Sequence, residues 1–278
     1  MKPHLSILVA TDFSPTADNA LTYALKLSEM LNAKLYVLHA CRIPSASTAA
    51  YPAGYYEAVN MSELKLAAEM KMSQLQLEYL ISSTVNYQCI TQLGPVLDSI
   101  RDVAKEKQID LIVMGTHKVS GMLEWLGSVT SDVAEKIPFP LLAIPNNVQC
   151  TVPRKFLLAT TLTQHASLPT LDRVKELVKQ LEAKLDVLCI QPQSKKLSSA
   201  QIQFKTALEH FLAGISHQLH IIDGEEVHDE IVKYAKQNEV DVLAMLPRQH
   251  NFFTQLFRSS KSRHMLFHTN TPLLLVHD

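Results

Sequence analysis

Two stretches of the chain decide the fold: SILVATDFSPTADNALTYALKLSEMLNAKLYVLHA at residues 6–40 and KFLLATTLTQHASLPTLDRVKELVKQLEAKLDVLCI at residues 155–190. Each runs from a short apolar segment through Ala-Thr and a polar loop into a helix-periodic segment. A second apolar segment follows in both and opens with Lys-Leu. Self-similarity over such a length indicates an internal duplication. We therefore interpret the chain as two copies of one structural unit.

Three further landmarks repeat in the same order in both copies. They are a glycine before a helix, a strand rich in Val, Ile and Leu, and a final apolar strand at 140–144 (PLLAI) and 272–276 (PLLLV). The polar, proline-bearing segment PNNVQCTVP at 145–153 separates the copies. We predict one domain over residues 1–148 and a second over residues 149–278.

Within each copy, short apolar segments alternate with helix-periodic segments, the pattern of a parallel sheet covered on both faces. Strands are expected near 5–11, 34–40, 86–92, 110–115 and 141–144, and again near 155–160, 184–190, 217–222, 241–246 and 272–276. In the first copy, helices are expected near 16–32, 57–82, 95–108 and 127–137. The Met residues and the Leu-rich helix faces are interpreted as ordinary core. The prediction is an α/β fold with two tandem five-stranded parallel sheets.

Composition limits the class of protein. The chain has 278 residues and a net charge of −1, so no overall field favours nucleic acid or an acidic membrane surface. The four cysteines lack metal-ligand spacing and are expected to remain free thiols in a reducing cytosol. The N-terminal stretch MKPHLSILVATDF is interpreted as a buried strand, not a signal peptide. No run approaches the roughly 18 apolar residues of a membrane span, so we expect a soluble, cytoplasmic protein.

The first predicted strand ends at Ala10-Thr11-Asp12. In an open parallel sheet, ligands bind beyond the carboxyl ends of the strands. A carboxylate at that edge accepts hydrogen bonds from a ribose hydroxyl or a base amine. The alternative, equally favoured by the residues alone, is that Asp12 only caps the next helix or forms the turn.

The fourth predicted strand ends at Met114-Gly115, and a helix is expected to open at Gly127-Ser128-Val129-Thr130. Glycine permits close backbone approach to an anion, and a helix N-terminus offers unpaired N–H groups to phosphate. Ser128 and Thr130 add hydroxyl donors. An ordinary strand-to-helix loop, with Ser128 as the helix cap, explains the same residues.

These two segments resemble the nucleotide-binding branch of the universal stress protein family. That family has an Asp just past strand 1, and Gly-x-x-Gly, nine residues, then Gly-Ser/Thr after strand 4. This chain has ILVATDFS at 7–14 and GTHKVSGMLEWLGSVT at 115–130, and the resemblance covers essentially all of it. It implies a Rossmann-like strand order of 3-2-1-4-5 in each copy. It also implies that the final strands of the two copies meet in an intramolecular pseudo-dimer.

The resemblance further implies an adenine-nucleotide site in the first copy. The residues at the family's site positions are Ala10, Thr11, Asp12, Ala40, Met114, Gly115, Thr116, His117, Lys118, Gly127, Ser128, Val129 and Thr130. The residues after strand 1 would contact adenine or ribose, and Ala40 would flank the base. Those after strand 4 would lie along the phosphates.

Both copies depart from the family pattern. Lys118 occupies the position of the second glycine, and only eight residues separate it from Gly127. Its side chain either crowds the phosphate loop or supplies a counter-charge to phosphate. In the second copy, Thr161 replaces Asp12 and Leu246 replaces Gly115, and aromatic residues in the loop 247–262 would fill the site. We predict that the second site is degenerate.

The function predicted on this basis is that of a stress-response regulatory protein. It would bind ATP or a related adenine nucleotide, with or without Mg²⁺. Hydrolysis would be slow at most, because the sequence contains no identifiable general base. The alternative is an interaction module without nucleotide, in which both sites have decayed. Protein partners and further self-association between chains remain open, and no nucleic-acid or membrane partner is predicted.

Overall fold

The structure is a computed structural model, and it describes residues 5–41, 56–116, 128–146, 148–160, 162, 168–191, 197–224, 227–246 and 271–276. The first copy comprises β1 (Ser6–Ala10), α1 (Pro15–Leu31), β2 (Lys34–Cys41), α2 (Tyr56–Leu75), the π-helical turn η1 (Gln76–Leu80), β3 (Tyr87–Leu93), α3 (Val96–Glu106), β4 (Leu111–Thr116), α4 (Ser128–Lys136) and β5 (Leu141–Pro145). The second comprises β6 (Lys155–Ala159), the 3₁₀ turn η2 (Leu168–Leu171), α5 (Asp172–Gln180), β7 (Lys184–Gln191), α6 (Ser199–Phe211), β8 (Ser216–Asp223), α7 (Val227–Gln237), β9 (Val242–Met245) and β10 (Leu273–Leu275).

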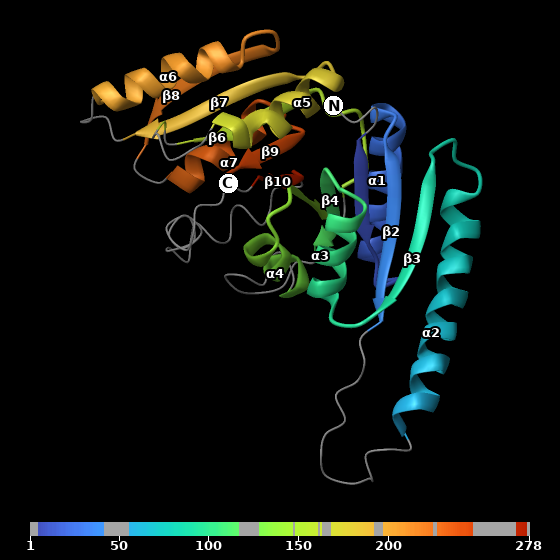
Figure 1. The fold of residues 1–278 in the computed structure, drawn as a ribbon. Coiled ribbons are helices and arrows are strands. Elements are labelled where there is room, and N and C mark those ends of the chain that lie inside the picture. The colour runs from blue at the N-terminus through green and yellow to red at the C-terminus, as the bar shows by residue number, and fades with distance from the viewer. Residues whose placement is uncertain are drawn as a thin grey trace.

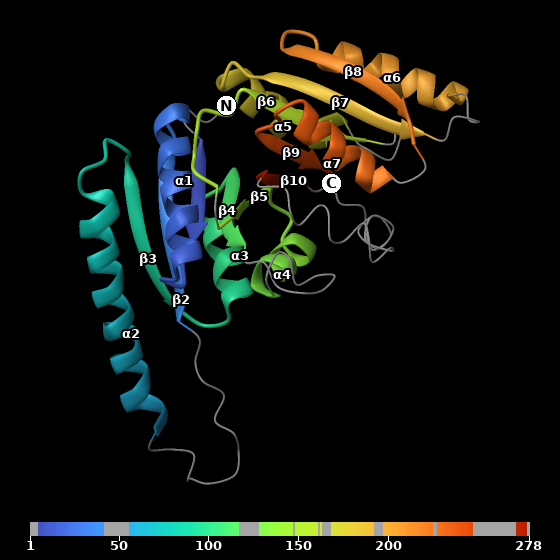
Figure 2. The same ribbon diagram turned by 180° about the vertical axis from the view of Figure 1, so that it is seen from behind.

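All ten strands form one continuous sheet in the order β3-β2-β1-β4-β5-β10-β9-β6-β7-β8 (Figures 1 and 2). The predicted order 3-2-1-4-5 therefore occurs in each copy. Every pairing within a copy is parallel, whereas β5 and β10 pair antiparallel, with Leu274 opposite Leu142. The predicted intramolecular pseudo-dimer is confirmed. Pairing these two strands also removes two sheet edges that would otherwise be open to unwanted association.

Helix α1 shows how local sequence places its first turn at the sheet edge. The Ser14 side chain accepts a hydrogen bond from the Ala17 N–H, and Pro15 occupies the first turn, where its missing N–H is harmless. The helix ends at Asn32, a left-handed residue whose N–H is donated to the carbonyls of Ser28 and Glu29. The predicted entry at Ser14-Pro15 is thus confirmed.

Two apolar clusters cover the two faces of the sheet, and each contains residues of both copies. One packs α1, α2, α5 and α6 against the sheet; the other packs α3, α4 and α7. The two copies consequently share their cores across the β5–β10 junction. An ion pair also crosses between them, with Arg173 Nη2 2.9 Å from Oδ1 of the buried Asp110.

The interpretation of every Leu-rich helix face as core is wrong for α2 and the π-helical turn η1 that continues it. Leu66, Met70 and Leu77 each expose more than half of their side chains. The sequence pattern misled because α2 also carries a buried apolar face, which includes Met72 and Leu75. All four cysteines are free. In the part of the chain that is described, no helix is long and apolar enough to cross a membrane.

Candidate functional site

A cavity of about 740 Å³ opens at the carboxyl ends of β1, β2 and β4 in the first copy. Its size lies within the range typical of small-molecule sites. Helix α2 forms one wall, and the first turns of α1 and α4 contribute others. The residues predicted from sequence that line it are Ala10, Thr11, Asp12, Ala40, Met114, Gly115, Val129 and Thr130. The topology therefore brings four separate segments of the predicted set into one pocket.

The other predicted residues lie elsewhere or are not described. Thr116 is buried and does not line the cavity; its hydroxyl donates to the Ile144 carbonyl at 3.4 Å. His117, Lys118 and Gly127 fall outside the described residues. Ser128 begins α4, but its side chain is also outside the described part.

The turn after β1 fixes the position of Asp12. The buried Thr11 hydroxyl oxygen accepts the Phe13 N–H at 3.0 Å, and Asp12 Oδ1 accepts the Ser14 N–H at 3.0 Å. The turn-forming role considered for Asp12 is therefore real. Because the residue is exposed at the pocket rim, the same hydrogen bond also orients its carboxylate beside the cavity.

The pocket residues that were not anticipated from the sequence include Phe13, His39 and Lys71. Phe13 adopts a left-handed conformation (φ 61°), and its ring packs against His39 with centroids 4.3 Å apart. His39 Nδ1 is 2.8 Å from the Thr11 carbonyl oxygen, so this nitrogen carries a proton and donates it. The Lys71 ammonium lies 5.7 Å from the Phe13 ring centroid, within cation–π range.

Gly115 has a structural reason to be glycine as well as a place in the pocket. A Cβ at this position would lie 2.5 Å from the carbonyl oxygen of Thr16 in the first turn of α1. The close approach observed is thus between β4 and α1, whereas the sequence suggested approach to an anion. This close approach of the two elements holds the start of α1 beside the pocket.

Thr130 corrects one expectation. Its hydroxyl was predicted to donate to phosphate, but it donates to the Gly115 carbonyl at 3.2 Å. This bond ties the first turn of α4 to the end of β4. The α4 side of the pocket is therefore positioned by Thr130.

Carboxylates concentrate beside the pocket. Burial, followed by the nearby Glu78 and Asp12 carboxylates, raises the pKa of Asp18. Burial also raises the pKa of the pocket thiol of Cys41, which lowers its thiolate fraction and hence its nucleophilicity. Among the described residues, no group of three or more metal-ligating side chains is present.

The second copy repeats the turn after its first strand. The Thr160 hydroxyl oxygen accepts the Leu162 N–H at 3.3 Å, and Leu162 is left-handed (φ 53°), as Phe13 is. Both Leu162 and Leu246, the counterpart of Gly115, are buried. Thr161 and the loop 247–262, on which the prediction of a degenerate site also depends, lie outside the described residues.

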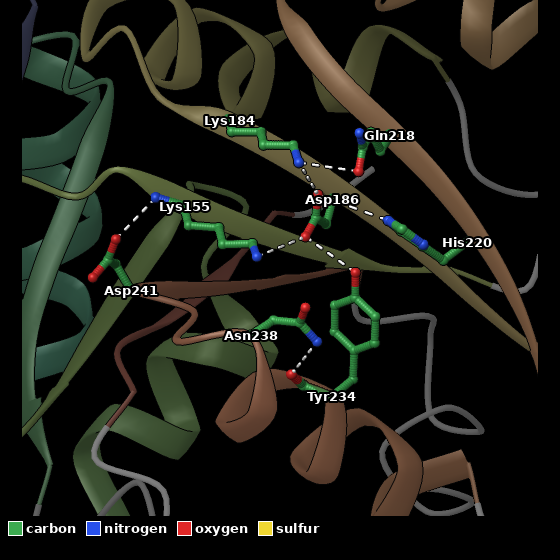
Figure 3. Close-up of polar contacts among 8 residues, drawn as sticks. All are labelled: Lys155, Lys184, Asp186, Gln218, His220, Tyr234, Asn238 and Asp241. Carbon is green, nitrogen blue, oxygen red and sulfur yellow. Dashed lines mark hydrogen bonds and ion pairs between the residues drawn. The ribbon is translucent and has the colours of Figure 1, made fainter.

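A separate polar cluster surrounds Asp186 on β7 (Figure 3). Its side chain is 2% exposed and lies between Lys155, at 3.3 Å, and Lys184, at 3.7 Å. The Tyr234 hydroxyl donates to Asp186 Oδ2 at 3.1 Å, and burial followed by this carboxylate raises the Tyr234 pKa to about 12. Asp186 Oδ1 and His220 Nε2 are buried and lie 3.9 Å apart, and neither has a hydrogen-bond partner in the described part of the chain.

Comparison with known proteins agrees with the duplicated fold. The model of the universal stress protein family matches residues 5–145 and again 153–277. Universal stress protein A homolog 2 of Coxiella burnetii is 32% identical over 146 residues, which is 52% of this chain and 97% of that protein. Universal stress protein Sll1388 of Synechocystis is 28% identical over 148 residues, 50% of this chain and 96% of its own length.

A solved universal stress protein from Archaeoglobus fulgidus superposes with a TM-score of 0.72 at 17% identity, covering 97% of this chain and 95% of that one. At that identity the likeness shows the fold alone. The two matches of the family model, together with the A homolog 2 relative, establish more: the chain belongs to the universal stress protein family and carries its domain twice.

Proposed function

We propose that the first copy binds ATP or a related adenine nucleotide, and that the protein acts as a stress-response regulator through this binding. The observation that supports the proposal best is the pocket at the carboxyl ends of β1, β2 and β4. It joins the small side chains of Ala10 and Ala40 to a carboxylate, Asp12, and to the start of α4. Such a strand-end crevice is where parallel α/β sheets bind nucleotides.

Each part of the pocket suits a different part of the ligand. The purine would lie between Ala10 and Ala40, which leave room for a flat ring. Asp12 would accept hydrogen bonds from a base amine or ribose hydroxyl. The polyphosphate would extend toward Gly115 and the N-terminus of α4, where helix N–H groups favour negative charge.

Several carboxylates near the pocket bear on the binding of an anionic ligand. Asp12, Asp18 and Glu78 lie close enough to interact electrostatically, whereas Lys71 is the cation that lines the cavity among the described residues. Mg²⁺ would offset phosphate charge beside these carboxylates. Affinity for ATP is therefore expected to rise when Mg²⁺ is added.

Calorimetric titration with ATP, ADP and AMP, each with and without Mg²⁺, tests the proposal. Asp12→Ala should weaken binding roughly 10–100-fold, the loss of one or two hydrogen bonds to a charged group. Asp102→Ala, an exposed carboxylate on α3 outside the pocket, is the matched control and should leave affinity unchanged. No heat with any nucleotide would reject the proposal.

The rival function is an interaction module without nucleotide. Ala40→Phe separates the two, because a phenyl ring at this position would occupy the space assigned to the base. We expect this variant to lose nucleotide binding and to keep its fold. If wild-type protein binds nucleotide and Ala40→Phe binds it equally well, the ligand occupies another site and the pocket assignment fails.

A further inference from the structure

Helix α2 and its π-turn are apolar on two opposite faces. The inner face, which includes Met72, Leu75 and Leu80, is buried against the sheet. On the opposite face four large apolar side chains are 59–66% exposed: Leu66, Met70, Leu77 and Ile81, which we call the outer stripe. A helix that is apolar all round is usually buried all round. The outer stripe therefore lacks a partner among the described residues.

The spacing makes the four side chains one continuous surface. Steps of four, seven and four residues keep them on one face of a helix. Fifteen residues of regular α-helix would still rotate Ile81 about 60° beyond Leu66. The π-turn, in which the Ile81 N–H is donated to the Gln76 carbonyl, winds less per residue and brings Ile81 back toward the line.

The second copy shows that the fold does not require this surface. Helix α6 occupies the equivalent place in the second copy and buries Phe204 and Leu208. Ile202, 51% exposed, is its single exposed large apolar residue in the described structure. Figures 1 and 2 show α2 at the outer margin of the first copy, with β3 beside it and no other labelled element beyond it.

The charges around the outer stripe identify the kind of partner that fits. Glu63 and Glu69 are exposed beside the outer stripe, and Lys65 is already 3.8 Å from Glu69. Lys71 and Glu78 lie on another side of the helix, where Lys71 is over Phe13 and Glu78 raises the pKa of Asp18. The rim of the outer stripe thus carries two carboxylates against one ammonium. A second copy would place acidic rim against acidic rim, and an anionic membrane would be repelled; a basic surface is complementary.

We propose that the outer stripe is a docking surface for a basic amphipathic helix of a partner protein. The stripe spans sixteen residues, about 22 Å of helix, so an apolar face of four turns would cover it while flanking Lys or Arg side chains meet the glutamates. A surface of this size corresponds to a weak, reversible contact, with a Kd in the micromolar range.

The test uses two synthetic helical peptides with the same apolar stripe, one flanked by lysines and the other by glutamates. Fluorescence anisotropy is measured on nucleotide-free full-length protein, so the outcome is independent of the proposed nucleotide site. The lysine peptide should bind at least tenfold more tightly than the glutamate peptide, and added salt should narrow the difference. Met70→Gln/Leu77→Gln should lose at least tenfold in affinity for the lysine peptide. Ile202→Gln, on α6, is the matched control and should bind as wild type does.

Circular dichroism melting verifies that the variants fold, which is expected because the substituted side chains are exposed. Equal affinity for the two peptides, or unchanged binding by Met70→Gln/Leu77→Gln, would overturn the proposal. So would a dimer in analytical ultracentrifugation that Met70→Gln/Leu77→Gln abolishes, because the occupant would then be a second copy. Co-sedimentation with anionic vesicles that depends on these residues would overturn it as well.

Discussion

Gly115→Ala tests the contact that holds the first turn of α1 against β4. The added Cβ would lie 2.5 Å from the Thr16 carbonyl oxygen and 2.7 Å from its Cγ2. Carbon and oxygen atoms in contact normally stay about 3.3 Å or more apart. The first obstacle is a backbone atom, so rotating a side chain cannot relieve the overlap. The start of α1 must move, and with it Thr16 and Ala17, which line the pocket.

Overpacking of this kind costs about 1–3 kcal/mol, a large part of the roughly 5–15 kcal/mol that stabilises a typical protein. For a chain of this size we expect Tm to fall by about 3–10 °C. In urea, the midpoint should fall with an unchanged m-value, because the surface exposed on unfolding is the same. Nucleotide affinity should fall as well, through displacement of the pocket wall.

Gly214→Ala is the control. Gly214 has a positive φ of 92°, but an added Cβ would meet no atom within 4 Å. Its cost is therefore that of backbone strain alone, about 1 kcal/mol. If Gly115→Ala is no more destabilising than Gly214→Ala, the close approach of α1 to β4 is not a constraint and the reasoning is refuted.

Three further predictions concern other groups. Asp186→Asn should lower the Tyr234 pKa from about 12, but not to 10, because burial is the larger cause; ultraviolet titration against wild type measures it. Burial raises the Cys189 pKa from 9 to about 11, so the folded state retains this proton as the unfolded state loses it, and stability falls between pH 9 and 11. Cys189→Ala should reduce this fall in the free energy of unfolding by about 1 kcal/mol, once solvent screening is allowed for. Urea midpoints measured between pH 9 and 11 test this. Arg173→Ala should cost about 1 kcal/mol, since it removes one ion pair of the buried Asp110, and an unchanged urea midpoint would contradict this.

The arrangement of the strands could be predicted because the information is local and occurs twice. Apolar runs such as ILVA and FLLA specify buried strands without reference to the rest of the chain, and the Ser14-Pro15 pair specifies a helix start. The duplication then allowed each assignment in one copy to be checked against the other. The join between β5 and β10 followed from the family resemblance, and their pairing confirms it.

The site was predicted less completely, because its details depend on contacts between segments. Strand ends could be located, so Asp12, Ala40 and Gly115 were placed correctly at one edge. The packing of Phe13 on His39 depends on the register of β1 against β2. The sequence does contain a signal for this turn. Phe13 and Leu162, which lie two residues after Thr11 and Thr160, share a left-handed conformation. The Thr-x-Phe segment of the first copy and the Thr-x-Leu segment of the second therefore mark the same turn.

The outer stripe was missed for a different reason. Hydrophobic periodicity shows that a helix has an apolar face, but it does not show whether anything covers that face. In α2 the two apolar faces together make the sequence resemble a fully buried helix. Only the positions of the neighbouring elements reveal that Leu66 and Met70 are exposed.

The duplication separates what the fold requires from what each copy has added. Both copies keep the turn after the first strand and the glycine before the third helix, so the scaffold alone explains those features.

Where the copies differ, the scaffold cannot be the reason. The first copy has Gly115 in the lining of its pocket where the second has the buried Leu246, and it has an apolar outer face on α2 that the described residues of α6 lack. The second has a polar cluster at Asp186, where the first packs the ring of Tyr36 beneath the Lys34 ammonium. A buried carboxylate with an oxygen that accepts no hydrogen bond among the described residues costs free energy that the first copy avoids with the same fold. The pocket and the outer stripe, on which the two proposals rest, are both features of the first copy, and the differences between copies show where function has to be sought.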